Sequence, residues 1–423
     1  MRAVTEEPRY QAFAASLTET GILSDPWLEG RPRFSAQPLV ISGAQLAVLY
    51  DTAEQVAAVY NQLALVCADH PLLAARYFGL TPFQRAMWAA SAPLWHGIAR
   101  SDVFLTADGP RVCELNCDTP SGEAEAVLLG AAAHAQRPQL ADPNSHLGAR
   151  FCDLIEVLGR RVAPPDPHPL SIGIVYPTEL TEDLSMIELY RRWFAARGWR
   201  VTLGSPFNLR PSGARGVALL GAPCHVVVRH YKTDWWGERV PVWAGDFEYG
   251  DPEPLAEQLA FLLSATLRGG VAVVNPFGAL IPQNKRAMAF FWEEIDRFPA
   301  WAQAVIRQNV PFTARLELCD LAELRAHKDE WVLKSDYGCE GSEVLVGRAV
   351  AQDEWTEALG AALPERWIAQ RHFDALPGGD GQVPNFGVYL VAGRAAGLFT
   401  RIEAGPTDRY ALTVPVLVES ARS

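Results

Sequence analysis

Four polar side chains at the end of a predicted β-hairpin have the types and spacing to bind a metal ion and a phosphate group. Two apolar segments, SDVFLT and RVCELN, flank an Asp-Gly turn and predict the hairpin. If the turn centres on Asp108, Arg100 lies opposite Asn116 and Asp102 lies opposite Glu114, all on one face. Carboxylate and amide oxygens suit Mg²⁺, and arginine suits phosphate. A solvated hairpin end with a surface ion pair would have the same spacing.

The two carboxylates of this hairpin also lead to an expectation about stability. Asp102 and Glu114 face each other across the predicted strands, and like charges at close range repel. Removing either carboxylate should therefore slightly raise the melting temperature of the protein without bound metal.

Two lysines further along the chain could neutralise phosphate groups. Lys334 ends a predicted strand, and the loop that follows, with Gly338 and Gly341, would let backbone N–H groups approach a phosphate closely. Lys285 follows Asn284, which can cap a helix, so that this cation would lie in the first helical turn against the helix dipole. An ordinary hairpin or a solvated lysine would show each pattern equally well.

The segment RHYKTDWWGER, residues 229–239, carries four basic side chains, one of them a histidine, and two adjacent tryptophans. It could form a lip over a substrate, or the tryptophans could cover a junction between lobes. The chain contains no HExxH, GxSxG or GxGxxG motif, which gives little support to a metalloprotease, a serine hydrolase or a dinucleotide enzyme.

The elements that must position these residues are of two kinds. Residues 10–100 are mostly helical by pattern, with the longest helix predicted over Ser42–His70. After a proline-rich linker at 162–169, strands alternate with a helix over Leu184–Arg197, which predicts an α/β lobe with a largely parallel sheet. The later strands have hairpin-like spacing and predict an antiparallel sheet. Three parts follow, namely 1–165 with the hairpin, 166–270 with the parallel sheet, and 271–423 with the later strands.

Composition limits the classes of partner. The chain has 423 residues with 37 basic and 49 acidic ones, a net charge of −12, which argues against nucleic acid or an anionic membrane as the main partner. The seven cysteines are scattered without a CxxC pair, so neither a zinc site nor a disulfide framework is expected. No apolar run suits a signal peptide or a membrane span, and we expect a cytoplasmic protein.

Taken in order along the chain, these segments resemble the circularly permuted ATP-grasp ligases, specifically the synthetase domain of glutathionylspermidine synthetase. The resemblance rests on six segments rather than on one motif: 26–34, 99–126, 275–288, 332–347, 366–373 and 387–405. It implies a multi-lobe fold with α/β and α+β parts, in which the metal-binding strands come first instead of last. It also implies ATP and Mg²⁺ as cofactors.

The resemblance assigns roles residue by residue. The nucleotide-binding positions fall on Lys285, Lys334, Gly338, Gly341 and Gln370, and the metal ligands on Asp102, Glu114 and Asn116. Arg100 and Arg401 correspond to catalytic arginines. Substrate positions fall on Thr119 and Ser121 for the carboxylate, on Glu182 and Asp183 for the amine, and on Cys339 in the glycine loop.

The implied reaction is ATP-dependent joining of a carboxylate to an amine through an acyl phosphate. The acid would be a small molecule or a peptide, and the amine a polyamine or an amino acid. Cys339 stands where the family usually has an arginine, which bears on recognition of glutathione. The chain shows no Cys–His amidase block, so hydrolysis of the product is not expected. An ATP-binding scaffold without turnover and an acyl-phosphate former that serves a partner protein are the alternatives, and a homodimer is a further prediction.

Overall fold

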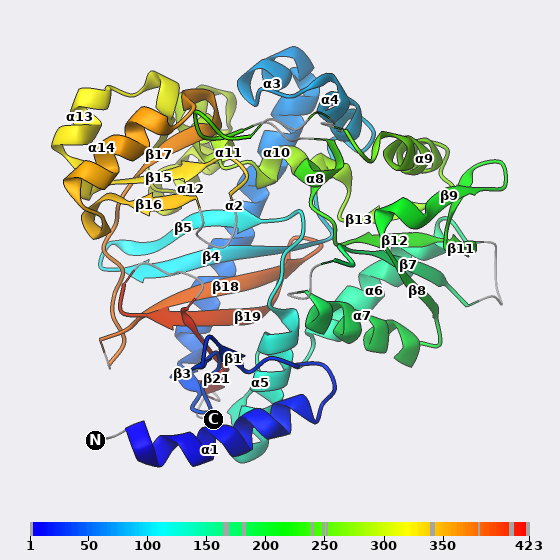
Figure 1. Cartoon of the computed structure of the whole chain (residues 1–423), viewed down its shortest axis with the longest axis horizontal. Helices are drawn as coiled ribbons and strands as arrows, with labels where there is room; N and C mark the ends of the chain where they lie inside the picture. The colour runs from blue at the N-terminus through cyan, green and yellow to red at the C-terminus, as the bar shows by residue number, and fades with distance from the viewer. Residues whose placement is uncertain are drawn as a thin grey trace.

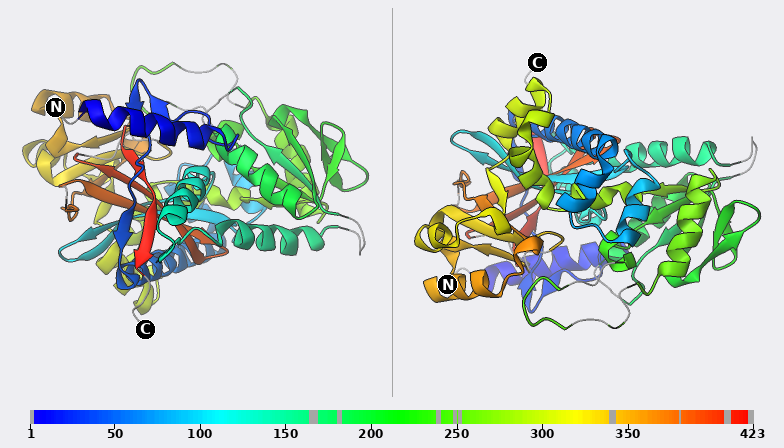
Figure 2. Two further views of the ribbon diagram at one scale, coloured as in Figure 1. Left: turned by 90° about the horizontal axis from the view of Figure 1, so that it is seen from below. Right: turned by 90° about the horizontal axis from the view of Figure 1, so that it is seen from above.

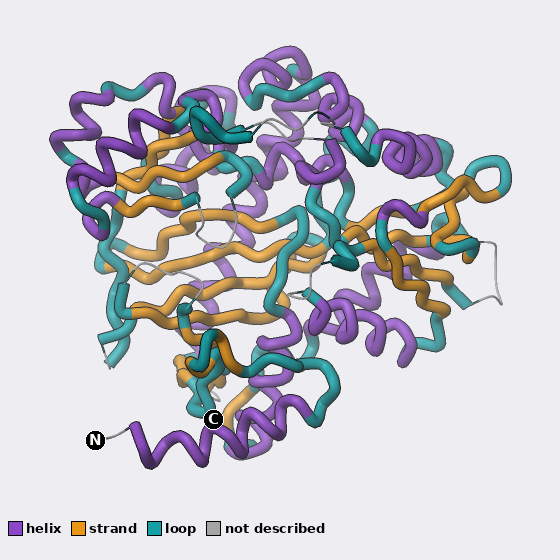
Figure 3. The backbone as a smooth tube through the Cα atoms, in the orientation of Figure 1, coloured by secondary structure: helices purple, strands orange, loops and turns teal. Residues whose placement is uncertain are grey.

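The computed structural model describes most of the chain in several lobes around a central sheet (Figure 1). The described residues are 3–163, 169–179, 183–237, 241–247, 250, 253–338, 343–379, 381–405 and 410–419. Figure 3 shows that strands and helices are both abundant, which agrees with a mixed α/β and α+β chain. Within the part of the chain that the structure describes, no helix has the length and hydropathy of a membrane span.

The central sheet combines strands from both ends of the chain. Its order is β20-β19-β18-β4-β5, and every neighbouring pair is antiparallel. The strands are β4 (Ile98–Thr106), β5 (Gly109–Asn116), β18 (Val383–Val391), β19 (Arg394–Glu403) and β20 (Leu412–Val414). The long helix α2 (Gly43–Asp69) packs on this sheet and lies behind it in Figure 1. The sequence therefore located α2 within one residue at each end.

The hairpin β4–β5 has the predicted pairing at its open end but a different turn. Arg100 pairs with Asn116 and Asp102 pairs with Glu114, whereas Thr106 pairs with Gly109. The loop therefore holds two residues and does not centre on Asp108. A register shift between Asp102 and Val103 leaves Cys113 as an extra residue in β5, and this bulge restores the predicted pairing.

A four-stranded parallel sheet forms the α/β lobe at the right of Figure 1. Its order is β13-β12-β7-β8, with β7 (Ser171–Val175), β8 (Arg200–Gly204), β12 (Val226–Arg229) and β13 (Ala272–Val274). Buried side chains of α6 (Leu147–Arg160) and α7 (Leu184–Ala196) pack with β7, as the apolar pattern of α7 predicts. Helix α9 (Ala256–Leu267) packs with the strands in a separate core cluster.

The segment 217–221 departs from the sequence-based prediction. We expected it among the strands of the parallel sheet, but it belongs to β10 (Gly216–Leu219) of a separate antiparallel sheet. The partners of β10 are β9 (Leu209–Ser212) and β11 (Ala222–Cys224). Short connections between these strands allow only hairpin pairing, because a parallel crossover needs a dozen or more residues.

Another sheet carries Lys334 and the start of the glycine loop that follows it. It is antiparallel, with order β14-β17-β15-β16, and Figure 1 shows it above the hairpin at the left. Its strands are β14 (Thr313–Arg315), β15 (Trp331–Ser335), β16 (Val344–Val346) and β17 (Trp367–Arg371). Helices α13 (Leu321–Ala326) and α14 (Gln352–Ala361) pack with it around Trp355 and Trp367. This arrangement agrees with the predicted late antiparallel strands.

The remaining elements close the structure around the two ends of the chain. A small sheet joins β3 (Leu39–Ile41), β21 (Val416–Glu419) and β6 (Leu140–Ala141), and α1 (Ala3–Thr18) is the dark blue helix in the left view of Figure 2. The other elements are short: β1 (Trp27–Leu28), β2 (Arg31–Pro32), α3 (Pro71–Tyr77), α4 (Pro82–Ala89), α5 (Glu123–Gln136), α8 (Thr233–Gly237), α10 (Leu280–Gln283), α11 (Arg286–Glu293) and α12 (Ala300–Asn309).

Candidate active site

The structure brings the four polar residues of the hairpin together at its open end. Arg100 is 7% exposed, and its Nε–H donates to Oδ1 of Asp102 at 2.9 Å. Within β5, the side-chain amide of Asn116 donates to Oε1 of Glu114 at 3.0 Å. The side chains of one face thus form two hydrogen-bonded pairs in which each carboxylate keeps a second oxygen for another partner.

Both predicted phosphate lysines reach this hairpin. Nζ of Lys334, on β15, donates to the carbonyl of Cys113 at 3.0 Å, the residue that bulges from β5. Nζ of Lys285 lies 3.9 Å from Oε2 of Glu114 and donates to the carbonyl of Gly338. Both lysines are 6% exposed, so their charges act on the site with little screening by water.

These cations determine the charge state of Glu114. Burial alone would raise the pKa of its carboxyl, but Lys285, Lys334, the Asn116 hydrogen bond and Arg100 lower that pKa to about 2. Glu114 is therefore ionised at every pH at which the protein is expected to work.

A second group of side chains converges on Asp102 from β18 and β19. Asn385 Nδ2 donates to Oδ2 of Asp102 at 3.3 Å, and Nη2 of Arg401 lies 3.9 Å from the same oxygen. Burial, opposed by the attraction of Asp102, lowers the pKa of Arg401. The Oδ1 atom of Asn385 is buried and has no hydrogen-bond partner among the described residues, so it is one oxygen that a further ligand could satisfy.

The site carries more positive than negative charge. The four cations are Arg100, Lys285, Lys334 and Arg401, and the two carboxylates are Asp102 and Glu114, which gives 4 − 2 = +2. Such an excess in a buried place favours an anion of several charges, and a polyphosphate is the common biological one.

Asp102, Glu114 and Asn116 fit a magnesium ion by their chemistry. They offer two carboxylates and an amide at directly opposed or adjacent positions of one hairpin, where side chains lie within reach of a single ion. No cluster of three or more His, Cys, Asp or Glu residues suited to a metal occurs in the described ranges. Phosphate oxygens would therefore have to complete the coordination, as is usual for Mg²⁺.

Of the three other residues predicted to bind the nucleotide, Gly338 and Gln370 are described, and both are hydrogen-bonded to other protein groups. Gly338 has no room for a side chain, because a Cβ at this position would lie 2.4 Å from Oγ of Ser335. Gln370 is 1% exposed and donates to Oγ1 of Thr313 at 3.0 Å. No contact between Gln370 and the hairpin is found among the described residues. Gly341 and Cys339 lie outside the described residues.

A loop over 117–122 leads from the hairpin to α5 and carries the predicted carboxylate-binding residues Thr119 and Ser121. The carbonyl of Ser121 accepts from Nη1 of Arg100 at 2.8 Å and from the hydroxyl of Tyr389 at 3.0 Å. Thr119 is half-buried between these anchors and the start of the loop. Arg100 thus links the metal-ligand candidates to the predicted substrate loop.

The start of this loop is anchored to the α/β lobe by Asp118, a residue that the sequence analysis missed. Asp118 forms a fully buried ion pair with Arg229 and accepts from the backbone N–H of Thr233 at 2.6 Å. Gln283 accepts from the backbone N–H of Asp118 at 3.0 Å. The Asp118–Arg229 contact joins residues far apart in the chain, so no local sequence signal could have identified it.

The predicted amine-binding pair is described only in part. Asp183 precedes α7 and lies 2.9 Å from Nε2 of His230, while Glu182 lies outside the described residues. In the segment 229–239, Trp236 is fully buried in the core of the α/β lobe, which supports the covering role for this side chain rather than a substrate lip.

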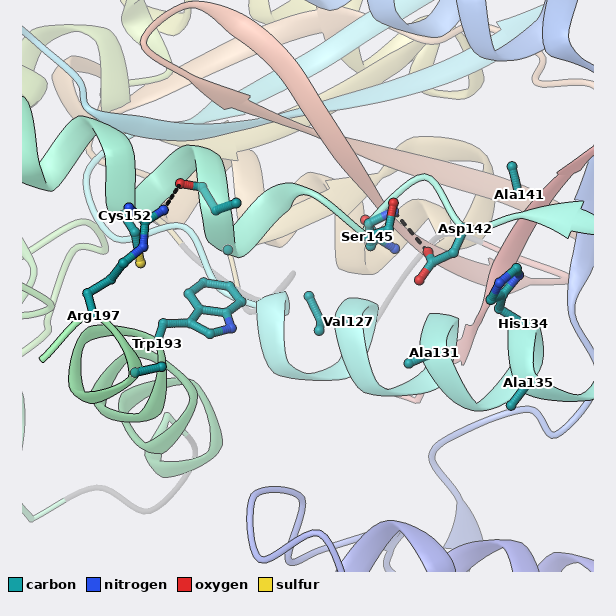
Figure 4. A pocket seen from close by; sticks show the side chains of 14 residues that line it. Val127, Ala131, His134, Ala135, Ala141, Asp142, Ser145, Cys152, Trp193 and Arg197 are labelled. Atoms are coloured by element: carbon teal, nitrogen blue, oxygen red, sulfur yellow. Dashed lines mark hydrogen bonds between the residues drawn. The ribbon is translucent and has the colours of Figure 1, made fainter. Parts of the chain in front are cut away.

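A larger cavity lies elsewhere. It measures about 760 Å³ and is lined by residues of α5, α6, α7 and the 141–145 loop, among them Trp193 and Asp142 (Figure 4). It shares no lining residue with the hairpin. A much smaller cavity, of about 10 Å³, lies beside the hairpin between Glu114, Lys285 and Met288. The charged groups therefore converge away from the large cavity.

Comparison with known proteins supports the resemblance seen in the sequence. Residues 253–419 match the family model described as glutathionylspermidine synthase preATP-grasp. Over this part the chain is similar to the glutathionylspermidine synthases. The matched part contains Lys285, Lys334, Gln370 and Arg401, whereas the hairpin precedes it.

Solved structures add evidence on the fold. A glutathione synthetase-like effector from Globodera pallida is similar at 8% identity and a TM-score of 0.59, over 98% of this chain and 96% of that chain. A candidate gamma-glutamylcysteine synthetase from Methylobacillus flagellatus is 13% identical with a TM-score of 0.45, over 86% of each chain. No curated protein matches. The likeness to the effector shows a glutathione synthetase-like, ATP-grasp-type fold over nearly the whole chain.

Proposed function

We propose that this protein is an ATP-dependent carboxylate–amine ligase. The observation that supports it best is the cluster of four cations around two carboxylates and an amide at the end of one hairpin. An excess of cations favours the triphosphate, and the oxygen ligands favour the magnesium ion that accompanies it. The family match over 253–419 supports the same class of enzyme.

Each part of the cluster has a role in phosphoryl transfer. Lys285 and Lys334 neutralise the phosphates as compact point charges, and Asp102, Glu114 and Asn116 would hold Mg²⁺. A bound Mg²⁺ supplies additional positive charge to the transferring phosphoryl group. Arg100 and Arg401 stabilise the charge that develops on that group, because both flank Asp102 in a buried place.

The reaction has two steps. An oxygen of the substrate carboxylate attacks the γ-phosphorus, the bond to ADP breaks, and an acyl phosphate forms. The lone pair of an amine nitrogen then attacks the acyl carbon, and the carbon–oxygen bond to phosphate breaks to give the amide. Thr119 and Ser121 lie on the loop that Arg100 contacts, so they are placed to hold the carboxylate. The acid is a small molecule or peptide, and the amine a polyamine or amino acid.

We further propose that the fold is circularly permuted. Strand β4 of the hairpin pairs with β18, which lies near the other end of the chain, and the lysines come between them in sequence. In ordinary ATP-grasp enzymes the metal-binding strands come last. The division into parts at 165 and 270, the cytoplasmic location and a homodimer stay predictions, as do roles for Gly338, Gly341, Gln370 and Cys339.

A screen for ADP release tests the ligase. The protein is incubated with Mg²⁺–ATP, hydroxylamine and a panel of carboxylic acids, and both ADP and hydroxamate are measured. We expect one class of acid to give both products in equal amounts, and Lys334→Ala to lose both. Lys328→Ala is the matched control, since this lysine precedes the same strand but donates to the carbonyl of Gly347. ATP binding without ADP release from any acid would favour the scaffold, and ADP release that requires only the acid would favour an acyl-phosphate former that serves a partner protein.

A further inference from the structure

The strand order of the parallel sheet in the α/β lobe gives it a topological switch point, the position at which open α/β sheets commonly bind ligands. From β7 the chain goes to β8 on one side, and β12 lies on the other side. The carboxyl ends of β7 and β12 therefore form the switch point of this sheet, where ligands bind in open α/β sheets. His230 directly follows β12, and its backbone N–H donates to the carbonyl of Val175, the last residue of β7, at 2.7 Å.

A contact with Asp183 fixes the orientation of the His230 side chain at this switch point. Its Nε2 lies 2.9 Å from Oδ2 of Asp183, and this is its one side-chain interaction in the described part of the chain. Burial would raise the pKa of the Asp183 carboxyl, but the hydrogen bond with His230 and the charge of Lys232 lower it. An ionised Asp183 accepts the proton of Nε2, so the lone pair of a neutral His230 lies on Nδ1.

The His230–Asp183 pair flanks the loop that is proposed to hold the substrate carboxylate. Arg229, the neighbour of His230, binds Asp118 at the start of this loop. At the other end, Tyr190 of α7, the helix that Asp183 precedes, donates to Oε1 of Glu123 at 3.0 Å. The elements that carry the pair thus contact both ends of the loop over 117–122.

We propose that His230, oriented by Asp183, is the base that accepts the proton of the amine substrate. This inference rests on the proposed ligase function. A primary amine is protonated at neutral pH and has no lone pair for attack. One N–H bond of the ammonium group breaks, and its proton moves to Nδ1 of His230. The freed lone pair attacks the acyl carbon, the carbon–oxygen bond to phosphate breaks, and the leaving phosphate takes up the second proton that the nitrogen loses. Asp183 is a positioning residue that also stabilises the resulting imidazolium, as an acidic partner does for a catalytic histidine.

Two small nucleophiles of equal heavy-atom count separate this role from the ligase function. Methylamine is almost fully protonated at neutral pH, whereas hydroxylamine is mostly unprotonated and needs no base for that first step. With the acid found in the hydroxylamine screen, His230→Gln should lower methylamide formation by about 10²- to 10⁴-fold. The same variant should keep hydroxamate formation and its ADP release within about threefold of the wild type. Glutamine retains a donor for Asp183, so the local structure is preserved.

The controls use the same sheet and the same pair. His225 lies at the opposite end of β12, where Nδ1 accepts from the backbone N–H of Ser171 at 3.1 Å, so His225→Gln should leave both products unchanged. Asp183→Asn should lower methylamide formation and keep hydroxamate formation. An equal loss of both products in His230→Gln, the loss of neither, or a wild type that makes hydroxamate but no methylamide would overturn the role of His230. A wild type that makes neither product would instead overturn the ligase.

Discussion

Replacing Glu123 by glutamine should stabilise the protein above neutral pH. Glu123 begins α5 directly after the substrate loop and is fully buried. Burial, which outweighs the hydrogen bond from Tyr190 and the charge of Arg100, raises the pKa of its carboxyl from 4.5 to about 8. In the folded protein the carboxyl is therefore protonated at pH 7, whereas in the unfolded chain it is ionised.

The sign and size of the effect follow from this difference. A raised pKa in the folded state means that stability is complete below pH 4.5 and is lost as the pH rises towards 8. Each unit corresponds to about 1.4 kcal/mol, so at pH 7 the free energy of unfolding should be lower than at pH 4.5 by about 3 kcal/mol from this group alone. Glutamine never ionises and can still accept the hydrogen bond of the Tyr190 hydroxyl.

The assay compares thermal midpoints of wild type and Glu123→Gln between about pH 4 and pH 8. The two proteins should melt together near the acid end of this range, and the variant should melt increasingly higher as the pH rises. Glu257→Gln is the control, because Glu257 also lies in the first turn of a helix but is exposed. A constant difference between wild type and Glu123→Gln over the whole pH range would refute the reasoning, because it would mean that Glu123 has the same pKa in both states.

Three further predictions concern the proposed site. Asp102→Ala, Glu114→Ala and Asn116→Ala should each lower turnover by about 10²-fold or more while the fold survives, and near-normal turnover of Glu114→Ala would remove the metal assignment. Lys334→Ala should weaken ATP binding, measured by calorimetry, more than Lys334→Arg, because a planar guanidinium only partly replaces a compact ammonium; unchanged affinity in both would contradict the role. Cys339→Arg should favour dicarboxylic over monocarboxylic acids by roughly 10- to 150-fold in kcat/KM, and a ratio within about twofold would place Cys339 away from the substrate.

Local patterns predicted the elements of this fold better than their assembly. The apolar periodicity located α2 and α7 almost to the residue, because each helix buries one face. The segment 217–221 forms an antiparallel strand in the lobe for which a largely parallel sheet was predicted. A short apolar run does not indicate whether a strand pairs in parallel or antiparallel fashion. The helix expected after Asn284 is α11, but its N-cap is Lys285 rather than Asn284, although Oδ1 of Asn284 accepts from the backbone N–H of Arg286.

The candidate site could be predicted only where its residues are neighbours in one hairpin. The pairing of Arg100 with Asn116 and of Asp102 with Glu114 followed from strand geometry, although the real turn is shorter and the bulge at Cys113 compensates. Contacts such as that of Asp118 with Arg229 depend on how lobes pack, and a single sequence carries no record of them. His230 was visible only as part of a basic segment, because its partner Asp183 lies on another element.

The surroundings of the hairpin reverse one expectation from the sequence. Seen as a hairpin alone, Asp102 and Glu114 repel each other, and removing one should stabilise the protein. In the folded chain Arg100, Lys285, Lys334 and Arg401 surround them, and the charges of Lys285, Lys334 and Arg100, with the hydrogen bond from Asn116, lower the pKa of Glu114. Removing a carboxylate would change the balance from +2 to +3 in a buried place, so repulsion among the cations becomes the larger effect. The melting temperature of Glu114→Ala without nucleotide should therefore fall, and a polyphosphate ligand, which supplies the missing negative charge, should restore part of it.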